Sequence, residues 1–420
     1  MLIKLKNRLT NYIESNVISE GYLISLVERL ESSGHTFNSC NRGYKQSTKL
    51  STYQHTWHVI NHLWYFVVCT RSIILMNSDN PLDSLYLGDF FSSTPGKNFL
   101  HANLIVYYLL FFSSRAAVHI KESSRPMLMF QFFDQIKYKG FDSANQLLSS
   151  TNYFTWRIYL YIALKFYFIG IPTVALSLFI LCLVFALENP SLYLSVYHFL
   201  WYFFWLLLIT GPLCFNVFVL FWYYTHTMCL VPYLFLAFSD INETGTMLNG
   251  LSDPRELADQ LKTIRTYLKR QNRLLNLLKI YNVDISTTMW TGYLISCFLA
   301  DFSLFMGLFV DSGSFTMNVI SLSLAITAFS NLFLLHFSGL LVNNKIMSIQ
   351  ENNFNLQARG VNIFPKSISI WINSTQERIE NGEIGVTICH IFAATQSSLL
   401  YSILENSGIF MMFVANFKKS

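Results

Sequence analysis

The chain has 420 residues, of which 52% are apolar and only 13% are charged. This composition excludes a soluble globular protein and a disordered chain, and it is typical of a membrane protein. The net charge of +5 is small, so its meaning depends on where the basic residues lie along the chain. We predict the lipid bilayer, and no nucleic acid, as the surroundings of this chain.

Residues 1–55 are predicted to form a cytosolic N-terminal segment. Its first 29 residues are basic and contain no apolar core of signal-peptide length, so they predict a short amphipathic helix. A link rich in Ser, Asn and Gly follows over residues 32–51, and no structure is predicted for it.

Seven apolar segments occupy residues 56–417 and predict a receptor or channel domain with seven transmembrane helices in an all-α polytopic membrane protein. They cover residues 57–76, 99–120, 158–187, 192–224, 290–310, 317–342 and 387–417. The third and fourth contain Pro172 and Pro212. Such prolines kink membrane helices, which is tolerated when neighbours satisfy the freed carbonyl groups.

The basic residues predict the orientation of these helices. On alternate connections they divide 24 to 3, with the N-terminus on the richer side and the C-terminus on the poorer. By the positive-inside rule the N-terminus is cytosolic and the C-terminus is extracellular.

The inner connections are long and helical in pattern, most clearly over residues 239–288, which we predict to be a cytosolic helical anchor region. Leu261, Ile264, Leu268, Leu275 and Leu278 recur there at helical spacing. Helices four to seven are therefore predicted to extend into the cytosol as a bundle, with short interfacial helices as the alternative.

The last segment, 387–417, has thirty-one residues, or about 46 Å of helix against a hydrocarbon core of roughly 30 Å. It must protrude from the lipid or break. Glu405 lies near its middle, and a carboxylate there is expected to face water or protein. We predict that this helix lines a pore, in which Glu405 attracts cations and Phe410 or Phe413 closes the path. The predicted pore residues are Glu405, Asn406, Phe410, Phe413, Asn416 and Phe417.

The alternative for Glu405 is a structural ion pair with a neighbouring helix, for instance with Arg71 or Lys165. Asp301 in the fifth segment is a similar but weaker candidate, because no second polar residue stands beside it.

A crowd of aromatic residues in the third and fourth segments, with hydroxyl residues of the sixth, could line a pocket for a small organic ligand. The alternative is ordinary core and lipid-facing packing, including an interfacial belt. The predicted pocket residues are Phe179, Tyr197, His198, Trp201, Trp205, Ser321 and Thr327.

No enzyme, cofactor or metal is predicted. The seven cysteines are scattered singly, and the histidines are not expected to cluster, although His58 and His62 are four residues apart. No phosphate-binding loop, nucleophile elbow or zinc-protease motif is present.

The chain resembles the insect-type gustatory and odorant receptors in its helix number, orientation, long inner connection after the fourth helix and length. Gustatory receptors of that superfamily end in Thr-Tyr, five hydrophobic residues and Gln-Phe. Here the corresponding residues are Ile409 and Phe410, then 411–415, then Asn416 and Phe417, of which only Phe417 is identical. The chain is thus similar to a divergent member.

This resemblance implies a multi-pass receptor of the plasma membrane that acts in taste as a ligand-gated, non-selective cation channel. It implies a homo- or hetero-tetramer with related subunits, anchored by the inner halves of helices four to seven. Its last helix would line the pore, and its ligand pocket would lie in the outer halves of helices two, three, four and six.

Two other functions compete with a channel. A secondary transporter could use the Gly-Pro breaks of the third and fourth helices to frame a solute site. A G-protein-coupled receptor has the opposite orientation, which the distribution of basic residues disfavours.

Overall fold

The computed structural model describes residues 19–417, except for 38, 46–50, 79, 93–95, 142–146, 252–253, 311–314, 361–362, 382–383 and 389–391. The first part of the predicted N-terminal helix, residues 1–18, and the terminal Lys418 and Lys419 lie outside the described residues. The side chains of Leu257, Phe413, Asn416 and Phe417 do as well.

The described residues are almost entirely helical. The helices in the first half of the sequence are α2 (Glu20–Thr36), α3 (Thr52–Asn77), α4 (Pro81–Tyr86), α5 (Lys97–Ser124), α6 (Phe130–Lys139), α7 (Ser150–Lys165), the π-helix η2 (Phe166–Gly170) and α8 (Ile171–Leu187). They are followed by the 3-10 helix η3 (Pro190–Tyr193), α9 (Val196–Asn249), α10 (Pro254–Asp259), α11 (Leu261–Phe309), α12 (Phe315–Gly360), α13 (Lys366–Glu380) and α14 (Gln396–Phe417). A two-stranded antiparallel hairpin, β1 (Thr387–Ile388) and β2 (Phe392–Ala393), precedes α14.

Six helices or helix pairs among the described residues are long and apolar enough to cross a membrane. They are Thr52–Asn77, Lys97–Ser124, Ser150–Val184, Val196–Asn249, Gly292–Phe309 and Phe315–Gly360. These correspond to the first six predicted segments, so the prediction of an all-α polytopic membrane protein is confirmed. That α14 is a seventh crossing stays a prediction, because several of its side chains lie outside the described part of the chain.

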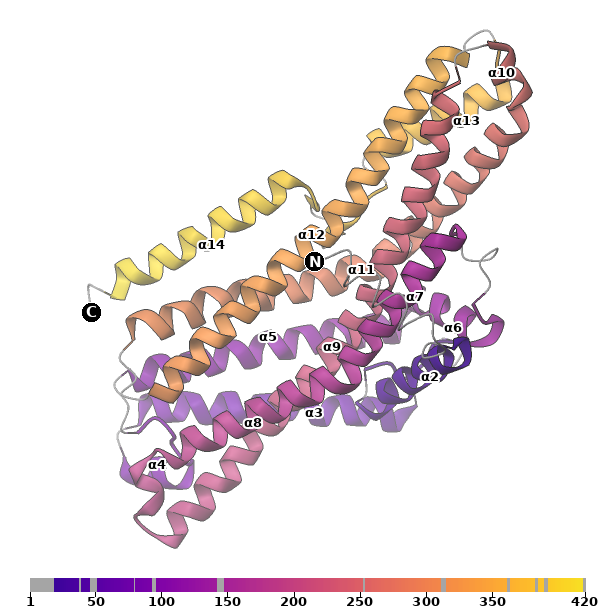
Figure 1. Ribbon diagram of the computed structural model, residues 1–420. Helices are drawn as coiled ribbons and strands as arrows, with labels where there is room; N and C mark the ends of the chain where they lie inside the picture. Colours follow the sequence, from indigo (N-terminus) through magenta and orange to yellow (C-terminus); the bar gives the residue numbers. More distant parts are fainter. Residues whose placement is uncertain are drawn as a thin grey trace, which may run out of the picture.

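The connections alternate between the two ends of the molecule. Figure 1 shows α4, the α8–α9 and α11–α12 turns and the C-terminus at one end, while α2, α6, α10 and α13 lie toward the other. The connections that sequence analysis places outside thus lie together at one end of the helical body.

Three helices extend far beyond the length of a membrane span, as predicted for helices four, five and six. α9, α11 and α12 contain 54, 49 and 46 residues. At 1.5 Å per residue they reach about 81, 74 and 69 Å, more than twice the hydrocarbon thickness. They pack on one another to form a rod that runs toward the end with α10 and α13 (Figure 1).

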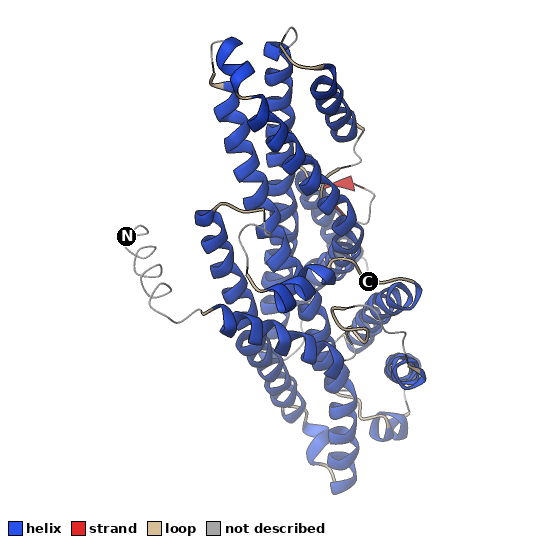
Figure 2. Cartoon of the chain, turned by 90° about the vertical axis from the view of Figure 1, so that its right-hand side faces the viewer, coloured by secondary structure: helices blue, strands red, loops and turns tan. Residues whose placement is uncertain are grey.

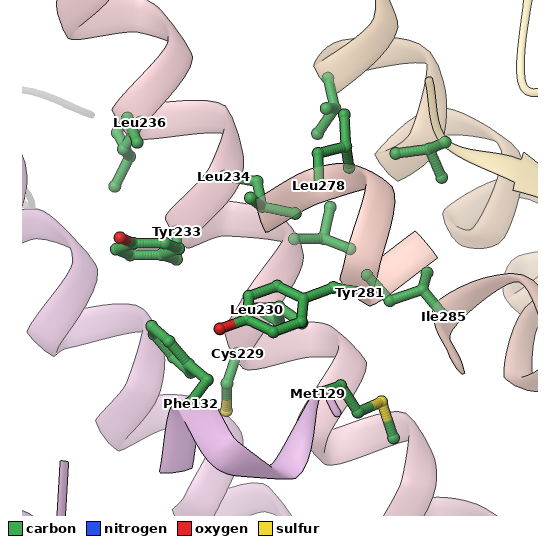
Figure 3. Packing of buried hydrophobic residues seen from close by; sticks show 14 of the residues in the cluster. Met129, Phe132, Cys229, Leu230, Tyr233, Leu234, Leu236, Leu278, Tyr281 and Ile285 are labelled. Carbon is green, nitrogen blue, oxygen red and sulfur yellow. The ribbon is translucent and has the colours of Figure 1, made fainter. Parts of the chain in front are cut away.

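One core lies in the half of the molecule that carries α2, α6 and α13, here called the inner half because the predicted orientation places it on the cytosolic side. It is built from the apolar faces of the long helices α9, α11 and α12 and of α2, α6 and α7. Phe132 of α6 contacts Tyr233 of α9, with ring centroids 4.7 Å apart, and Tyr281 of α11 at 6.3 Å. Figure 3 shows these three rings among the leucines of α9 and α11. Leu268 and Leu275 of the predicted leucine face are fully buried in the same core. The predicted leucine face is therefore buried within the chain.

A second core fills the outer half and contains many aromatic side chains of α3, α5, α9 and α11. Pro212 of α9 has no backbone N–H, so the carbonyl of Leu208 loses its partner within the helix. The indole Nε1 of Trp64 on α3 donates to that carbonyl at 2.9 Å. The hydroxyl of Tyr108 on α5 donates to the next carbonyl, of Ile209, at 2.5 Å. The predicted satisfaction of the freed carbonyl by neighbouring helices is thus found at Pro212.

The seventh predicted helix begins later than expected, at Gln396 instead of 387. Residues Thr387–Ile388 and Phe392–Ala393 pair as strands, which lie in red beside the helical rod in Figure 2. Thr395 and Ser398 then exchange hydrogen bonds between side chain and backbone, which caps the helix and fixes its start. Of the two alternatives for an over-long segment, the structure adopts the break, and in the described part of the chain α14 has 22 residues and does not extend like α9, α11 and α12.

Candidate functional site

The start of α14 is held by the side chain of Asn343 on α12. Its Oδ1 accepts from the backbone N–H of Val386 at 2.7 Å, and its Nδ2 donates to the carbonyl groups of Val386 and Ala394 at 3.0 and 2.9 Å. Asn282 of α11 holds Thr387 in a similar way, because its Oδ1 accepts from the Thr387 N–H at 3.1 Å and its Nδ2 donates to Thr387 Oγ1 at 3.0 Å. These bonds close the ends of the hairpin and place α14 relative to two of the long helices.

Along its length α14 packs on α11 through a stripe of residues at four-residue spacing. Ser402 and Asn406 are buried, and the Nδ2 of Asn406 donates to Ser402 O at 2.6 Å and contacts the Sγ of Cys297 at 3.7 Å. One turn further on, the ring of Phe410 lies 5.8 Å from that of Phe309. Asn406 and Phe410, two predicted pore residues, therefore face their own chain.

The other side of α14 is open. Its exposed apolar residues are Leu400, Tyr401, Ile403, Leu404, Met411 and Met412. Glu405 is exposed on the edge of this face, where its Oε2 accepts from the Tyr293 hydroxyl at 3.4 Å. Of the predicted pore residues with described side chains, Glu405 is the one that the fold leaves uncovered.

The predicted structural partners of Glu405 are engaged elsewhere. The guanidinium of Arg71 donates to the carbonyls of Leu87 and Gly88 at 2.6 and 2.5 Å. The ammonium of Lys165 lies over the rings of Tyr22 and Tyr161, at 5.3 and 5.8 Å from their centroids. Neither forms the ion pair that sequence analysis considered, so that alternative is wrong for these two residues.

Asp301 on α11 is buried, with 1% of its surface exposed, near the middle of the candidate span Gly292–Phe309. Neither carboxylate oxygen has a hydrogen-bond partner among the described residues. An ionised carboxylate at the centre of a membrane helix costs at least about 2.5 kcal/mol unless water, a partner or a cation compensates it. Sequence analysis ranked this residue below Glu405 because its neighbours in sequence are apolar.

The predicted ligand-pocket residues are only partly brought together. Trp201 and Trp205 both contact Tyr86, the first by ring contact at 5.9 Å and the second through a hydrogen bond from Nε1 to the Tyr86 carbonyl at 2.8 Å. His198 is half-buried and bonds Ser195 Oγ at 2.7 Å through its Nδ1, whereas Tyr197 is 71% exposed. Both tryptophans therefore pack with the outer core, Trp205 within it and the half-buried Trp201 against it.

The remaining pocket residues lie on other helices. Phe179 of α8 is half-buried, Ser321 of α12 is buried, and the exposed Thr327 donates to the Ser323 carbonyl at 2.8 Å. Within the described residues, no hydrogen bond or ring contact joins these three to Trp201 or Trp205. The pocket stays a prediction.

A small cavity of about 20 Å³ lies between α5 and α9, where Arg115, Asn216 and Tyr223 line it. It contains none of the predicted pocket residues and has room for about one water molecule. It is too small for an organic ligand.

Two polar clusters were missed by sequence analysis. In the outer loop, the buried carboxylate of Asp89 lies 3.0 Å from both the Lys97 ammonium and the His101 Nε2. Arg71 is part of the same region, because it holds the carbonyls of the two residues before Asp89. The feature of the sequence that indicates this cluster is Arg71, because a cation within an apolar segment requires polar partners nearby.

The second cluster corrects the expectation that the histidines are dispersed. His55 Nδ1 lies 3.4 Å from His119 Nε2, and the rings of His58 and His119 are 3.9 Å apart. Because α3 and α5 pack antiparallel, the start of α3 lies beside the end of α5. Over the part of the chain that the structure describes, no three or more side chains of His, Cys, Asp or Glu lie together in a group that could hold a metal ion.

No family model and no curated protein matches the chain. Solved structures with a similar course of the chain include the insect olfactory receptor OR5 from Machilis hrabei in complex with eugenol. It is 13% identical, has a TM-score of 0.46 and matches over 94% of this chain and 98% of that chain. A second structure of OR5 from Machilis hrabei matches with a TM-score of 0.45 and 13% identity, over 86% and 89% of the two chains. Both are insect olfactory receptors, the type of protein that the sequence resembles.

Proposed function

We propose that the chain is a divergent member of the insect-type gustatory and odorant receptor superfamily. It is a chemosensory receptor of the plasma membrane that acts as a ligand-gated, non-selective cation channel of the gustatory type. A small organic molecule opens it, and four subunits, identical or related, enclose its pore.

The observation that carries this proposal is the open face of α14. A membrane helix with a carboxylate on one edge is stable when that edge meets water or another polar group. α14 is covered by its own chain along the Ser402–Asn406–Phe410 stripe, and Glu405 lies beside the uncovered face. In a closed ring of subunits the Glu405 side chains would form a ring of carboxylates that attracts cations.

The rod of α9, α11 and α12 supports the same assembly. These helices continue far beyond the candidate spans, and their inner ends are braced by α13, in which Ile368 and Ile372 are buried. Thr375 of α13 also donates to Asn272 of α11 at 3.1 Å. A stiff inner rod of this kind gives four subunits a fixed attachment while α14 stays on a hairpin connection.

We place the ligand pocket in the outer half, around Phe179, Trp201 and Ser321, where half-buried aromatic residues and hydroxyl groups of three helices occur. Small organic ligands bind where apolar walls carry a few polar groups. Ligand binding there would act on α14 through the outer core, to which Phe410 and Val414 belong.

Recording from the purified protein in a planar bilayer tests the proposal. A channel gives unitary current steps with cation-selective reversal potentials, whereas a secondary transporter moves solute without such steps. Leu404→Cys, on the open face of α14, should make the current sensitive to a charged thiol reagent. Phe333→Cys, an exposed position of α12, is the matched control and should not. Solute uptake without unitary currents would overturn the channel proposal.

A further inference from the structure

The carboxylate of Asp301 lies on the face of α11 that meets α14. Tyr293 and Cys297 precede Asp301 by eight and four residues, and Phe309 follows it by eight, so all four residues share this face. Apart from Asp301, all of them contact α14, at Glu405, Asn406 and Phe410 in turn. Asp301 lies one turn beyond Cys297 on the same face, and Glu405 is a charged group close enough to interact with it.

The groups gathered there are acceptors without matching donors. Both oxygens of Asp301 and the Oδ1 of Asn406 are buried and have no hydrogen-bond partner among the described residues. The two side chains are 1% and 4% exposed. Both N–H donors of the Asn406 amide are engaged elsewhere, because its Nδ2 donates to the Ser402 carbonyl and to the Cys297 Sγ.

No described basic side chain neutralises these acids. The salt bridges of the described residues involve Asp89, Asp284, Glu31, Glu20 and Asp240, and none involves Asp301 or Glu405. The other titratable groups that face this place are Cys297 and Tyr293 of α11 and, on α12, His336, whose ring lies 5.6 Å from that of Tyr293. A buried carboxylate, a second carboxylate beside it and unpaired oxygen acceptors together call for a cation.

We propose that Asp301, Asn406 and Glu405 form a binding site for a hard metal cation between α11 and α14 within each subunit. Carboxylate and amide oxygens are the ligands that Ca²⁺ and Na⁺ prefer. A divalent ion would balance both carboxylates, so Ca²⁺ is the preferred occupant. The ion ties α14 to α11 at the middle of the bilayer, and the site does not depend on whether the assembled protein conducts.

Thermal unfolding of the full-length protein in nanodiscs tests the site, since a ligand that binds the folded state raises the melting temperature with its concentration. Calcium and sodium chloride are each titrated against N-methyl-D-glucamine chloride at constant ionic strength. We expect a saturable rise in melting temperature with Ca²⁺, or with Na⁺ at higher concentration. Asp301→Asn should abolish this rise and leave the protein more stable than the wild type in N-methyl-D-glucamine.

Glu405→Gln keeps the test decisive if Asp301→Asn does not fold. Glu405 is exposed, so the variant should fold and need a higher cation concentration for half of the shift. Asp89→Asn is the matched control, because that buried carboxylate already has Lys97 and His101 as partners. It should lower the melting temperature in every salt and keep the cation response.

Three outcomes would overturn the site. The first is a wild-type melting temperature that ignores both metal cations. The second is an unchanged cation response in both Asp301→Asn and Glu405→Gln. The third is a stability that rises only as the pH falls, equally in all salts, which would mean that Asp301 binds a proton instead. Because the readout is stability, a silent bilayer recording would not affect the result.

Discussion

Asn343 on α12 binds both the N–H and the carbonyl of Val386, the last residue before the hairpin that leads to α14. The distances are 2.7 Å from the Val386 nitrogen to Oδ1 and 3.0 Å from Nδ2 to the Val386 oxygen. The Val386 carbonyl also accepts from the Ala394 N–H at 3.1 Å, so the Asn343 amide adds to the backbone pairing at the end of the hairpin. The position of α14 therefore depends in part on Asn343, a polar residue of α12, although α13 and the hairpin separate α12 from α14 along the chain.

Asn343→Ala should loosen α14 without unfolding the rod. It removes hydrogen bonds to three backbone groups, and leaving partly buried partners unsatisfied costs about 1–3 kcal/mol. Proteolysis or hydrogen exchange should show faster opening of residues 386–417 than of α9 or α11. Asn344→Ala, one residue further and exposed, is the control and should behave as wild type. Equal protection in both variants would contradict the role given to Asn343.

The division of basic residues predicts the topology of the expressed protein. An epitope tag at the C-terminus should be accessible on intact cells, and one at the N-terminus only after permeabilisation. The measurement is antibody staining of the same cells before and after detergent. The reverse pattern would remove the channel proposal and restore a G-protein-coupled receptor.

Glu405→Gln should lower single-channel conductance and weaken block by divalent cations. Charged linings raise the local cation concentration about 10-fold or more, so a several-fold fall is expected if the four carboxylates line the path. Surface expression should stay normal, because the side chain is exposed and its one hydrogen bond, from Tyr293, survives the change. Misfolding with unchanged conductance of the residual channels would make Glu405 a structural residue and place the pore elsewhere.

Leu268→Ala should destabilise each chain and not only its assembly. The side chain is fully buried in the inner core, and truncation of a buried leucine costs about 2–5 kcal/mol. The melting temperature of the purified subunit should fall. Thr266→Ala, exposed two residues earlier, should leave it unchanged. A variant that keeps its monomer stability but loses oligomers would return this face to the subunit interface.

Asp89 should make the outer half sensitive to acid. Burial alone would raise the pKa of this carboxyl, but the hydrogen bonds and charges of His101 and Lys97 outweigh it and lower the pKa below its usual value. The stabilisation from the ionised form is complete above the ordinary aspartate pKa of about 3.9 and disappears as the pH falls toward the folded value.

The matching variant is Asp89→Asn, which leaves the half-buried Lys97 without its partner and should cost about 1–3 kcal/mol near neutral pH. Its melting temperature should approach that of the wild type as the pH falls below about 4. Asp259→Asn, an exposed carboxylate of α10, isolates the general effect of acid on the protein. A stability difference for Asp89→Asn that stays constant from pH 7 to pH 3 would contradict the assignment.

Sequence patterns predicted the parts of this fold that depend on local chemistry. Apolar segment length located the first six candidate spans, and leucine spacing around Leu268 and Leu275 located the inner extension of α11. They missed the hairpin before α14, because residues 387–393 are apolar enough to continue a helix. Only the distant Asn343 and Asn282 show that the backbone there is paired in another way.

For the candidate site too, the sequence reveals some residues, whereas the role of others depends on how the helices pack. Glu405 is conspicuous in the sequence because it interrupts an apolar segment. The placement of Asn406 toward α11, and the lack of hydrogen-bond partners of Asp301 among the described residues, depend on which faces of two helices meet. The histidine contact between His55 and His119 likewise requires the antiparallel register of α3 and α5. A single sequence carries no direct record of such register.

Pro212 of α9 has a mechanical consequence. In an unbroken helix the Leu208 carbonyl would be bonded within α9, and bending there would depend on α9 alone. Because Pro212 has no N–H to donate, the Leu208 carbonyl accepts from the indole of Trp64 instead, and the hydrogen bond joins α9 to α3. Bending of α9 at this level therefore also lengthens the hydrogen bond to α3. As long as this bond is intact, the movements of the first and fourth predicted membrane helices are coupled.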